Sequence, residues 1–314
     1  MIQIRESGYK DITAIEALTQ KWSVKFSPEY GGKMLSLVCR ETGREILEQA
    51  TGQCYRKPQY AASYIDAECS AFDDMFPTID ECFGMEYPWH GTLYPDHGEV
   101  YSLPWQYEKL DDCLHMWVYS VRFSYRLDKF IYDKEGALRV AYKAHNLSPF
   151  AFSCLYAAHC MLKAEEGAVL EVPYEDGSRC TLIFSDIKQL GSYGDKIIWP
   201  AHNGWDLSRT PPKSAGVGYK IYFDQPMGES ICTYAYPNGQ RLRMRLKGMP
   251  YFAIWANYGA FKGMYNVAVE PCTAALDSPF IAKAHGKGSS LPGGAAYEWE
   301  MEFDMEPVDK TFRG

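Results

Sequence analysis

Two kinds of side chain in this sequence are suited to moving protons: the histidines, and a glutamate that directly follows an apolar run. The glutamate is Glu270, after the run from Val267 to Val269. The seven histidines are His90, His97, His115, His145, His159, His202 and His285. An imidazole titrates near neutral pH, and burial can tune a carboxylate upward, so a His and Glu pair can act as acid and base. Opening a pyranose ring needs such a pair, because the anomeric hydroxyl loses a proton while the ring oxygen gains one.

The neighbours of four histidines favour structural roles or leave the role open. His115 begins a predicted strand and His285 lies in a loop rich in Gly and Lys, which indicates structural or solvated side chains. His145 stands at a predicted strand end, where it can cap a turn. His202 lies among turn-forming residues and remains open as a substrate contact.

The local sequence alone leaves the remaining candidates undecided. His97 precedes a glycine in a loop-like setting, which favours a ligand contact. His159, flanked by Ala158 and Cys160, is typical of a buried core histidine. Glu270 is equally readable as the partner of an arginine at a sheet edge.

The segment from Asp96 to Trp105 reads Asp-His-Gly-Glu-Val-Tyr-Ser-Leu-Pro-Trp. It resembles the His-Gly…Trp motif of the galactose mutarotase (aldose 1-epimerase) superfamily, with the same spacing between His97 and Trp105 (105 − 97 = 8). In that family the histidine binds the sugar, so the resemblance implies that His97 does so here. Tyr101 stands where the family's motif commonly has an arginine.

Two later segments resemble the catalytic strands of the same family. The run from Tyr156 to Leu162 is similar to the strand that carries the family's acid histidine, although the usual Pro-aromatic pair after it is absent. Further on, a Glu-Pro step at Glu270 lies between Trp255 and Asp277, which resembles the family's Trp…Glu-Pro…Asp stretch. The resemblance therefore implies His159 as the acid and Glu270 as the base of an aldose 1-epimerase.

Weaker similarities extend the resemblance along most of the chain. Gly31-Gly32 lies in a unit like the family's early strand–Gly-Gly–strand, and Phe76-Pro77 resembles the family's Phe-Pro step before the His-Gly motif. Residues 20 to 305 thus match the family's order of motifs. The resemblance implies a galactose mutarotase-like β-supersandwich.

Five further residues are candidates for binding the sugar. Asp73 and Asp74 are turn formers or acceptors for sugar hydroxyls, with Asp73 slightly favoured. Trp105 and Trp255 are sugar platforms or core residues. Arg56 is a weaker candidate, because it lies upstream of the His-Gly motif, where the family's binding arginine often sits.

The elements that must position these residues are mostly strands. Runs rich in Val, Ile, Tyr, Phe and Thr, bounded by Gly, Pro, Asn or Asp, are typical of strands. They cover residues 22–26, 33–39, 116–127, 138–145, 152–162, 180–184, 218–223, 240–246, 251–255, 266–269 and 297–303. Residues 133–136 and 237–239 predict tight hairpin turns. The segment 11–20 fits a short helix or a strand equally well.

This pattern predicts an all-β protein, a large antiparallel β-sandwich formed by one domain over residues 1–314. Between Ala50 and Trp105 the strand pattern gives way to a long polar, aromatic and turn-rich stretch. Irregular segments of that length are usually functional or disordered, and the many rings argue against disorder. We expect part of the site there.

Composition excludes several classes of function. The formal charge is 32 − 40 = −8 without a long basic run, which argues against nucleic acid and anionic membranes as partners. No apolar run is long enough to span a membrane or to serve as a signal peptide. Ten scattered cysteines without a C-x-x-C pair favour reduced thiols in the cytoplasm and no metal site. The expected partner is a small sugar, and no cofactor is expected.

Three alternatives remain open at this stage. The same chemistry could serve a phosphorylated or otherwise modified sugar. The motifs are poor in arginine, however, and acidic residues are frequent in the irregular stretch. Both features favour a neutral hexose or a cationic sugar as the substrate. The protein could bind carbohydrate without turnover. It could also be a glycosidase, with Asp73 or Glu99 as a second carboxylate beside Glu270. The oligomeric state is not predicted.

Overall fold

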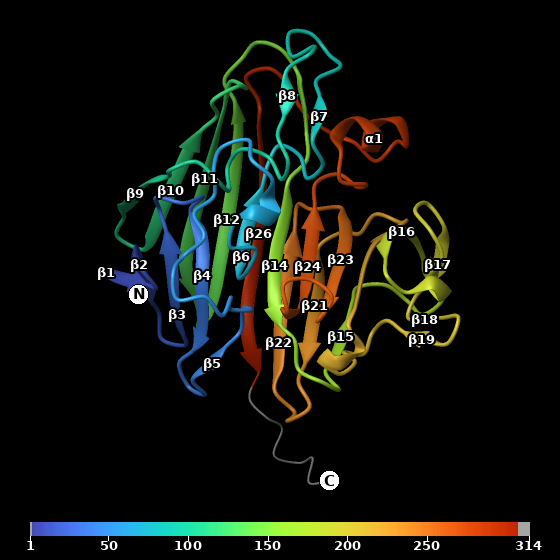
Figure 1. The fold of residues 1–314 in the computed structure, drawn as a ribbon. Coiled ribbons are helices and arrows are strands. Elements are labelled where there is room, and N and C mark those ends of the chain that lie inside the picture. Colours follow the sequence, from blue (N-terminus) through green and yellow to red (C-terminus); the bar gives the residue numbers. More distant parts are fainter. Residues whose placement is uncertain (1, 307–314) are drawn as a thin grey trace.

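Two large antiparallel sheets form the body of the protein (Figure 1). The computed structural model describes residues 2–306; residue 1 and residues 307–314, which the expected domain includes, lie outside the described residues. The prediction of a large antiparallel β-sandwich is confirmed. None of the helices formed by residues 2–306 is long and apolar enough to cross a membrane.

The first sheet carries the candidate catalytic residues. In spatial order its strands are β1 (Gln3–Tyr9), β2 (Ile12–Leu18), β3 (Trp22–Ser27), β4 (Lys33–Cys39), β6 (Phe72–Met75), β14 (Ala157–Lys163), β24 (Tyr265–Cys272), β23 (Tyr251–Tyr258), β20 (Val217–Phe223), β16 (Arg179–Ser185) and β17 (Lys196–Ile198), with β5 (Arg44–Glu45) beside β4.

The second sheet packs against the first. Its strands are, in order, β15 (Val169–Glu171), β21 (Ser230–Ala235), β22 (Arg241–Lys247), β26 (Ala296–Glu306), β12 (Ala137–Asn146), β11 (Tyr125–Lys134), β10 (Cys113–Tyr119) and β9 (Gln106–Lys109). Three small sheets pair β13 (Phe152–Cys154) with β25 (Ser289–Leu291), β18 (Ala201–His202) with β19 (Trp205–Asp206), and β7 (Cys82–Phe83) with β8 (Leu93–Tyr94). The helical elements are α1 (Pro279–Ala284) and the 3₁₀ turns η1 (Tyr64–Asp66), η2 (Lys188–Leu190) and η3 (Lys213–Ala215).

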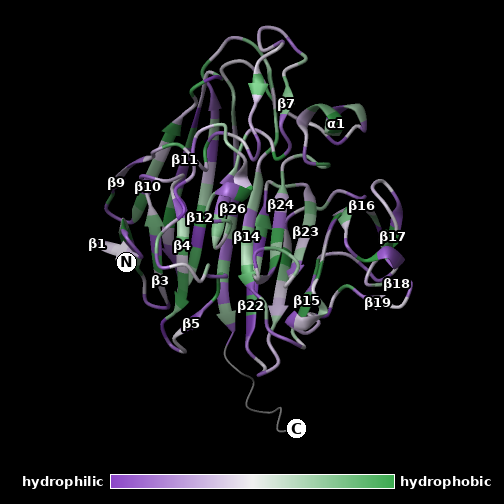
Figure 2. Ribbon diagram, viewed as in Figure 1, coloured by the Kyte–Doolittle hydropathy of each residue, from purple (hydrophilic) through white to green (hydrophobic). Residues whose placement is uncertain are grey.

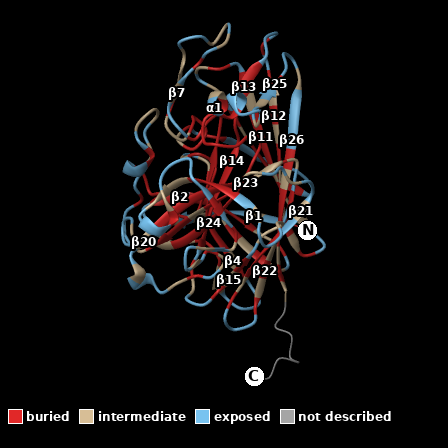
Figure 3. Cartoon of the chain, turned by 90° about the vertical axis from the view of Figure 1, so that its right-hand side faces the viewer, coloured by how far each residue is buried: buried red, intermediate tan, exposed pale blue. Residues whose placement is uncertain are grey.

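Strands β3, β12 and β22 bury alternate residues, because successive side chains of a strand point to opposite faces. In β12 the residues Leu138, Val140, Tyr142 and Ala144 are buried while those between them are partly exposed. Hydrophobic and hydrophilic residues accordingly occur along the same strands (Figure 2). The buried residues gather in the centre of the molecule (Figure 3).

β14 and β24 depart from this alternation, because they are buried on both faces. Residues such as Cys160 and Val269 belong to the core between the sheets. Their neighbours Met161 and Ala268 belong to a second apolar cluster, together with Tyr64 from the irregular stretch. The segments that cover the outer face of this part of the sheet therefore enclose a second interior, where polar side chains are shielded from water.

The structure shows which elements form where the sequence left a segment ambiguous or joined two strands into one run. Residues 12–18 of the ambiguous segment form strand β2, and the hairpin turn at 133–136 is confirmed, with positive φ at Glu135 and Gly136. The runs 116–127 and 152–162 each contain two strands separated by a short irregular segment, and the one-turn helix α1 was not predicted.

Candidate functional site

Neighbouring strands of the first sheet bring three of the predicted site residues together. In β14, His159 lies directly opposite Asp73 of β6. On the other side of β14, Ala157 pairs with Cys272 and Cys160 with Val269, and this register sets Glu270 opposite His159. Side chains paired in register share a face of the sheet, so the carboxyl, imidazole and second carboxyl groups project side by side into the second interior.

Glu270 is fully buried and lies between an imidazole and an ammonium group. Its Oε1 is 3.2 Å from Nε2 of His159, and its Oε2 is 3.1 Å from Nζ of Lys220. Lys220 Nζ also lies 2.8 Å from Oδ1 of Asp277, which accepts a hydrogen bond from Tyr222. Burial alone would raise the pKa of Glu270, but the charge of Lys220 and the contact with His159 outweigh burial and lower the pKa to about 2.

The carboxylate of Glu270 is charged and yet has open acceptor positions. Within residues 2–306, neither of its oxygens has a hydrogen-bond partner, because the two cationic neighbours lie at ion-pair distance without the angles of a hydrogen bond. Buried polar groups are nearly always hydrogen-bonded. The oxygens of Glu270 therefore keep acceptor capacity that its two neighbours do not use, which makes the carboxylate a candidate contact for hydroxyl groups of a ligand.

A chain of buried polar groups holds the other edge of the His159 ring. Its Nδ1 is 3.2 Å from the hydroxyl of Tyr64, which donates a 2.8 Å hydrogen bond to Oδ2 of Asp73. The same oxygen of Asp73 forms a buried ion pair with Lys33 at 2.7 Å. Asp73, one of the predicted sugar-binding residues, thus supports the histidine instead of standing free.

His97 lies at the margin of this group, where the site meets solvent. Its Nδ1 is 2.7 Å from Oδ1 of Asp96, and its ring stacks on Tyr64 with centroids 4.2 Å apart. The His97 and His159 rings lie 5.7 Å apart, edge to face. The His97 side chain is 20% exposed, against 8% for His159, and burial lowers its pKa. His97 has a φ of 57°, in the left-handed region where strain often accompanies function.

Two of the predicted sugar-binding residues lie elsewhere. Asp74 follows Asp73 in β6 and points to the opposite face, where it pairs with Lys129 at 2.7 Å inside the sandwich. The Trp105 ring packs against the same ammonium, 4.8 Å from the ring centroid, and its Nε1 donates to the carbonyl of Val100. The structure gives these two residues a core position, away from His159 and Glu270.

Trp255 does lie on the face of the site. It is the direct neighbour of Lys220 in the pairing of β20 with β23 and is half-buried. Its ring lies 5.8 Å from that of Phe184 and 5.4 Å from that of Phe261. These three rings form an aromatic group beside Lys220, on the same face of the sheet as Glu270.

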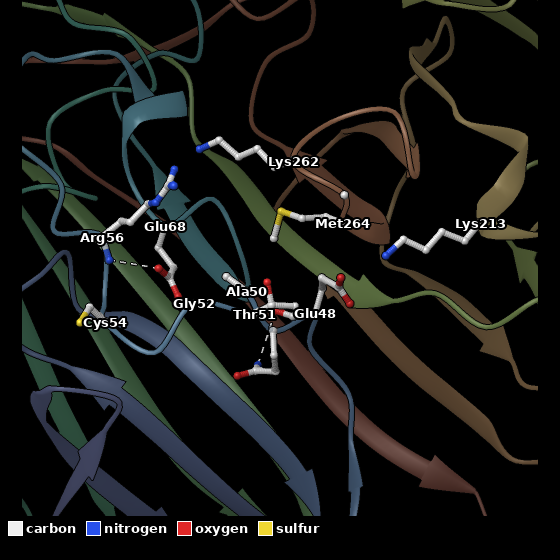
Figure 4. A pocket seen from close by; sticks show the side chains of 12 residues that line it. Glu48, Ala50, Thr51, Gly52, Cys54, Arg56, Glu68, Lys213, Lys262 and Met264 are labelled. Atoms are coloured by element: carbon white, nitrogen blue, oxygen red, sulfur yellow. Dashed lines mark hydrogen bonds between the residues drawn. The ribbon is translucent and has the colours of Figure 1, made fainter.

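Arg56 lines a separate pocket of about 350 Å³ (Figure 4). Its backbone N–H donates to Glu68, and Lys262, Lys213 and Glu48 line the same pocket. Neither His159 nor Glu270 is among the lining residues. The structure therefore does not bring Arg56 together with the acid and base candidates.

Sequence reasoning missed two members of the site. Lys220 is a charged residue in the middle of the apolar strand β20, and this interruption was a signal that it has a buried partner. Tyr64 lies on the turn η1 of the irregular stretch, and nothing in its local sequence singles it out. Within the part of the chain that the structure describes, no group of three or more His, Cys, Asp and Glu side chains could hold a metal ion.

Comparison with known proteins places the fold. No family model matches the sequence, and no curated protein is similar to it. Solved structures do match: a galactose mutarotase-like protein from Lactobacillus casei has a TM-score of 0.66 at 16% identity, over 93% of this chain and 100% of that one. A galactose mutarotase related enzyme from Lactobacillus acidophilus has a TM-score of 0.68 at 13% identity, over 95% and 98%.

A galactose mutarotase-like protein from Clostridium acetobutylicum is similar over 97% of this chain and 98% of that one, with a TM-score of 0.65 and 12% identity. The chain has the galactose mutarotase-like fold. The predicted resemblance is thereby confirmed at the level of the fold. Within this fold, the contact between His159 and Glu270 is the feature that a proposed function has to account for.

The charge of Glu270 makes the stability of the protein depend on pH. The folded-state pKa of about 2 lies below the ordinary 4.5. The ionised carboxylate therefore stabilises the fold fully above pH 4.5, by about 3 kcal/mol. This contribution is lost as the pH falls from 4.5 to about 2. We expect the difference in free energy of unfolding between the wild type and Glu270→Gln to change over this interval, as measured by urea denaturation. A difference that is constant with pH would contradict the lowered pKa.

Proposed function

We propose that the protein is an aldose 1-epimerase, which interconverts the α and β anomers of a hexose by acid/base opening of the ring. The observation that carries the proposal is the contact of His159 Nε2 with Glu270 Oε1 at 3.2 Å inside a shielded site. The anomeric hydroxyl oxygen and the ring oxygen are bonded to the same carbon. An acid and a base that lie side by side can therefore reach both oxygens of one sugar.

In the proposed reaction, Glu270 accepts the proton of the anomeric hydroxyl while His159 Nε2 donates its proton to the ring oxygen. The bond between the anomeric carbon and the ring oxygen breaks, and the anomeric carbon becomes an aldehyde. Rotation about the bond to the next carbon presents the other face of the aldehyde. The ring closes again with both proton transfers reversed, so the enzyme returns to its starting state. Each group contributes about 10²–10⁴-fold by general catalysis.

The charges around the pair support a neutral substrate. Lys220 is already shared between Glu270 and Asp277, and Lys33 is paired with Asp73. Neither ammonium is left to bind a phosphate or sulfonate, which needs several cationic donors. We propose an unmodified hexose, with His97 and Trp255 as its further contacts. The ten cysteines, all free thiols, fit a reducing compartment, and we propose the cytoplasm as the location.

The direct test is the optical rotation of freshly dissolved α-glucose and α-galactose in a weakly buffering solution, with and without protein. We expect the approach to equilibrium to accelerate in proportion to protein concentration. Heat-denatured protein at the same concentration is the control for catalysis by the buffer and by exposed side chains. If neither sugar is accelerated but either one binds, the protein is a carbohydrate-binding protein and the proposal is wrong.

A further inference from the structure

Tyr64 links the candidate acid to a buried ion pair. Its hydroxyl lies between Nδ1 of His159, at 3.2 Å, and Oδ2 of Asp73, at 2.8 Å. The side chain is buried, and burial raises its pKa well above the ordinary value, so the phenol keeps its proton. The single proton of this hydroxyl can serve only one of the two contacts.

The ion pair decides which contact receives that proton. Asp73 lies 2.7 Å from the ammonium of Lys33, and both side chains are buried. A buried carboxylate beside an ammonium is ionised, and an ionised carboxylate can only accept hydrogen bonds. Tyr64 therefore donates to Asp73, and its oxygen is left as an acceptor. The contact at 3.2 Å is then satisfied only when Nδ1 of His159 carries a proton.

The opposite edge of the ring faces a second carboxylate. Nε2 of His159 is 3.2 Å from Oε1 of Glu270, whose lowered pKa keeps it ionised at neutral pH. A bare Nε2 would direct its lone pair at this negative charge, whereas a protonated Nε2 is attracted by it. Each edge of the imidazole thus meets a group that stabilises a proton on the adjacent nitrogen.

We infer that Tyr64 is a positioning residue that holds His159 doubly protonated in the free protein, ready to give the Nε2 proton to a sugar ring oxygen. The catalytic part of this inference rests on the proposed function. The protonation state does not, because it follows from hydrogen-bond donors and acceptors alone. It differs from the usual neutral histidine, in which one nitrogen is bare.

Of the other charged groups near His159, some favour a proton on its ring and others disfavour it. His97 faces its ring edge to face and carries Asp96 as a partner, so any positive charge on His97 is balanced within that pair. Lys220 lies on the far oxygen of Glu270 and is shared with Asp277. The carboxylates Asp73 and Glu270 are the charged groups closest to the ring through its own contacts, and both favour the protonated form.

The experiment is nitrogen-15 NMR of the histidine side chains across a pH titration, in the wild type, in Tyr64→Phe and in Tyr101→Phe. Tyr101 is the matched control, because its ring contacts Tyr64 edge to face while its hydroxyl donates to the carbonyl of Ala62. We expect both nitrogens of His159 to be protonated near neutral pH in the wild type. In Tyr64→Phe the Nδ1 signal should move towards that of a bare nitrogen at the same pH, because Nδ1 loses its acceptor. Tyr101→Phe should leave the Nδ1 signal unchanged.

The rate of mutarotation gives the second readout. Tyr64→Phe should lower kcat about tenfold near neutral pH with a smaller change in KM, because loss of the Nδ1 acceptor leaves less of His159 in the acid form. A bare Nδ1 in the wild type overturns the inference, whether or not the variant folds, and so does an unchanged Nδ1 signal in Tyr64→Phe. If the NMR result is as expected but the wild type does not accelerate mutarotation, the protonation inference stands and the proposed function fails.

Discussion

Glu270→Gln is expected to lower the rate of α-glucose or α-galactose mutarotation by about two to four orders of magnitude. The amide has the shape of the carboxylate but cannot accept a proton from the anomeric hydroxyl. His159→Asn should lower the rate by a similar factor, because it removes the acid. Both are measured by polarimetry over a range of sugar concentrations, which separates kcat from KM.

The matched control is Glu298→Gln, which makes the same chemical change at an exposed side chain paired with Lys143. This variant should keep the wild-type rate, since exposed ion pairs contribute little to stability and this one lies on the second sheet. Circular dichroism of all three variants shows whether the fold is kept. A folded Glu270→Gln or His159→Asn protein with a near-normal rate means that the replaced residue is not the base or the acid.

Lys220→Met is expected to have the largest effect on stability, about 3–5 kcal/mol in the free energy of unfolding. The substitution removes the one ammonium that Glu270 and Asp277 share. Glu270 keeps its contact with His159 and Asp277 keeps the hydrogen bond from Tyr222, but neither buried carboxylate keeps its ammonium partner. Urea denaturation near neutral pH measures the loss. Lys143→Met, in an exposed pair, should cost well under 1 kcal/mol and is the control.

The same substitution should change the pH dependence of the rate. Lys220 lowers the pKa of Glu270, so removing the ammonium raises this pKa, and Glu270 then loses its basic form at a higher pH than in the wild type. The acidic limb of the pH–rate profile should therefore move to higher pH. Lys220→Arg keeps the positive charge, so the acidic limb of its pH–rate profile should stay where it is in the wild type. This variant still tests the role of the charge if Lys220→Met does not fold. An acidic limb that is identical in the Met variant and the wild type contradicts the role given to Lys220.

The strand pattern predicted the fold because burying one face of a strand produces an alternation of apolar and polar residues that can be recognised in the sequence. The runs that became β12 and β22 alternate between buried and more exposed residues and were found almost in full. The run from 152 to 162 was read as one strand, because residues 155 and 156 between β13 and β14 are also buried and apolar. Apolar character reports burial, and burial does not distinguish a strand from a covered loop.

The candidate site was predicted only in part, for a different reason. The family resemblance pointed to His159 and Glu270, and their contact depends on the register of β14 with β24, which lie about a hundred residues apart in the sequence. The sequence favours Asp73 over Asp74 only slightly, yet the pleat sends Asp73 to the site and Asp74 into the sandwich. Lys220 and Tyr64 act through partners that are distant along the chain, and no local pattern identifies such partners.

The proposed acid–base pair and the residues around it belong to different kinds of structure. His159 and Glu270 are fixed by the backbone ladder of two adjacent central strands, whereas Tyr64 and His97 come from the long irregular stretch between residues 50 and 105. Insertions or exchanges in that stretch can reshape the entrance without moving the two strands. If the proposed function holds, substrate preference can therefore be redesigned by loop grafting while the ring-opening pair stays in place.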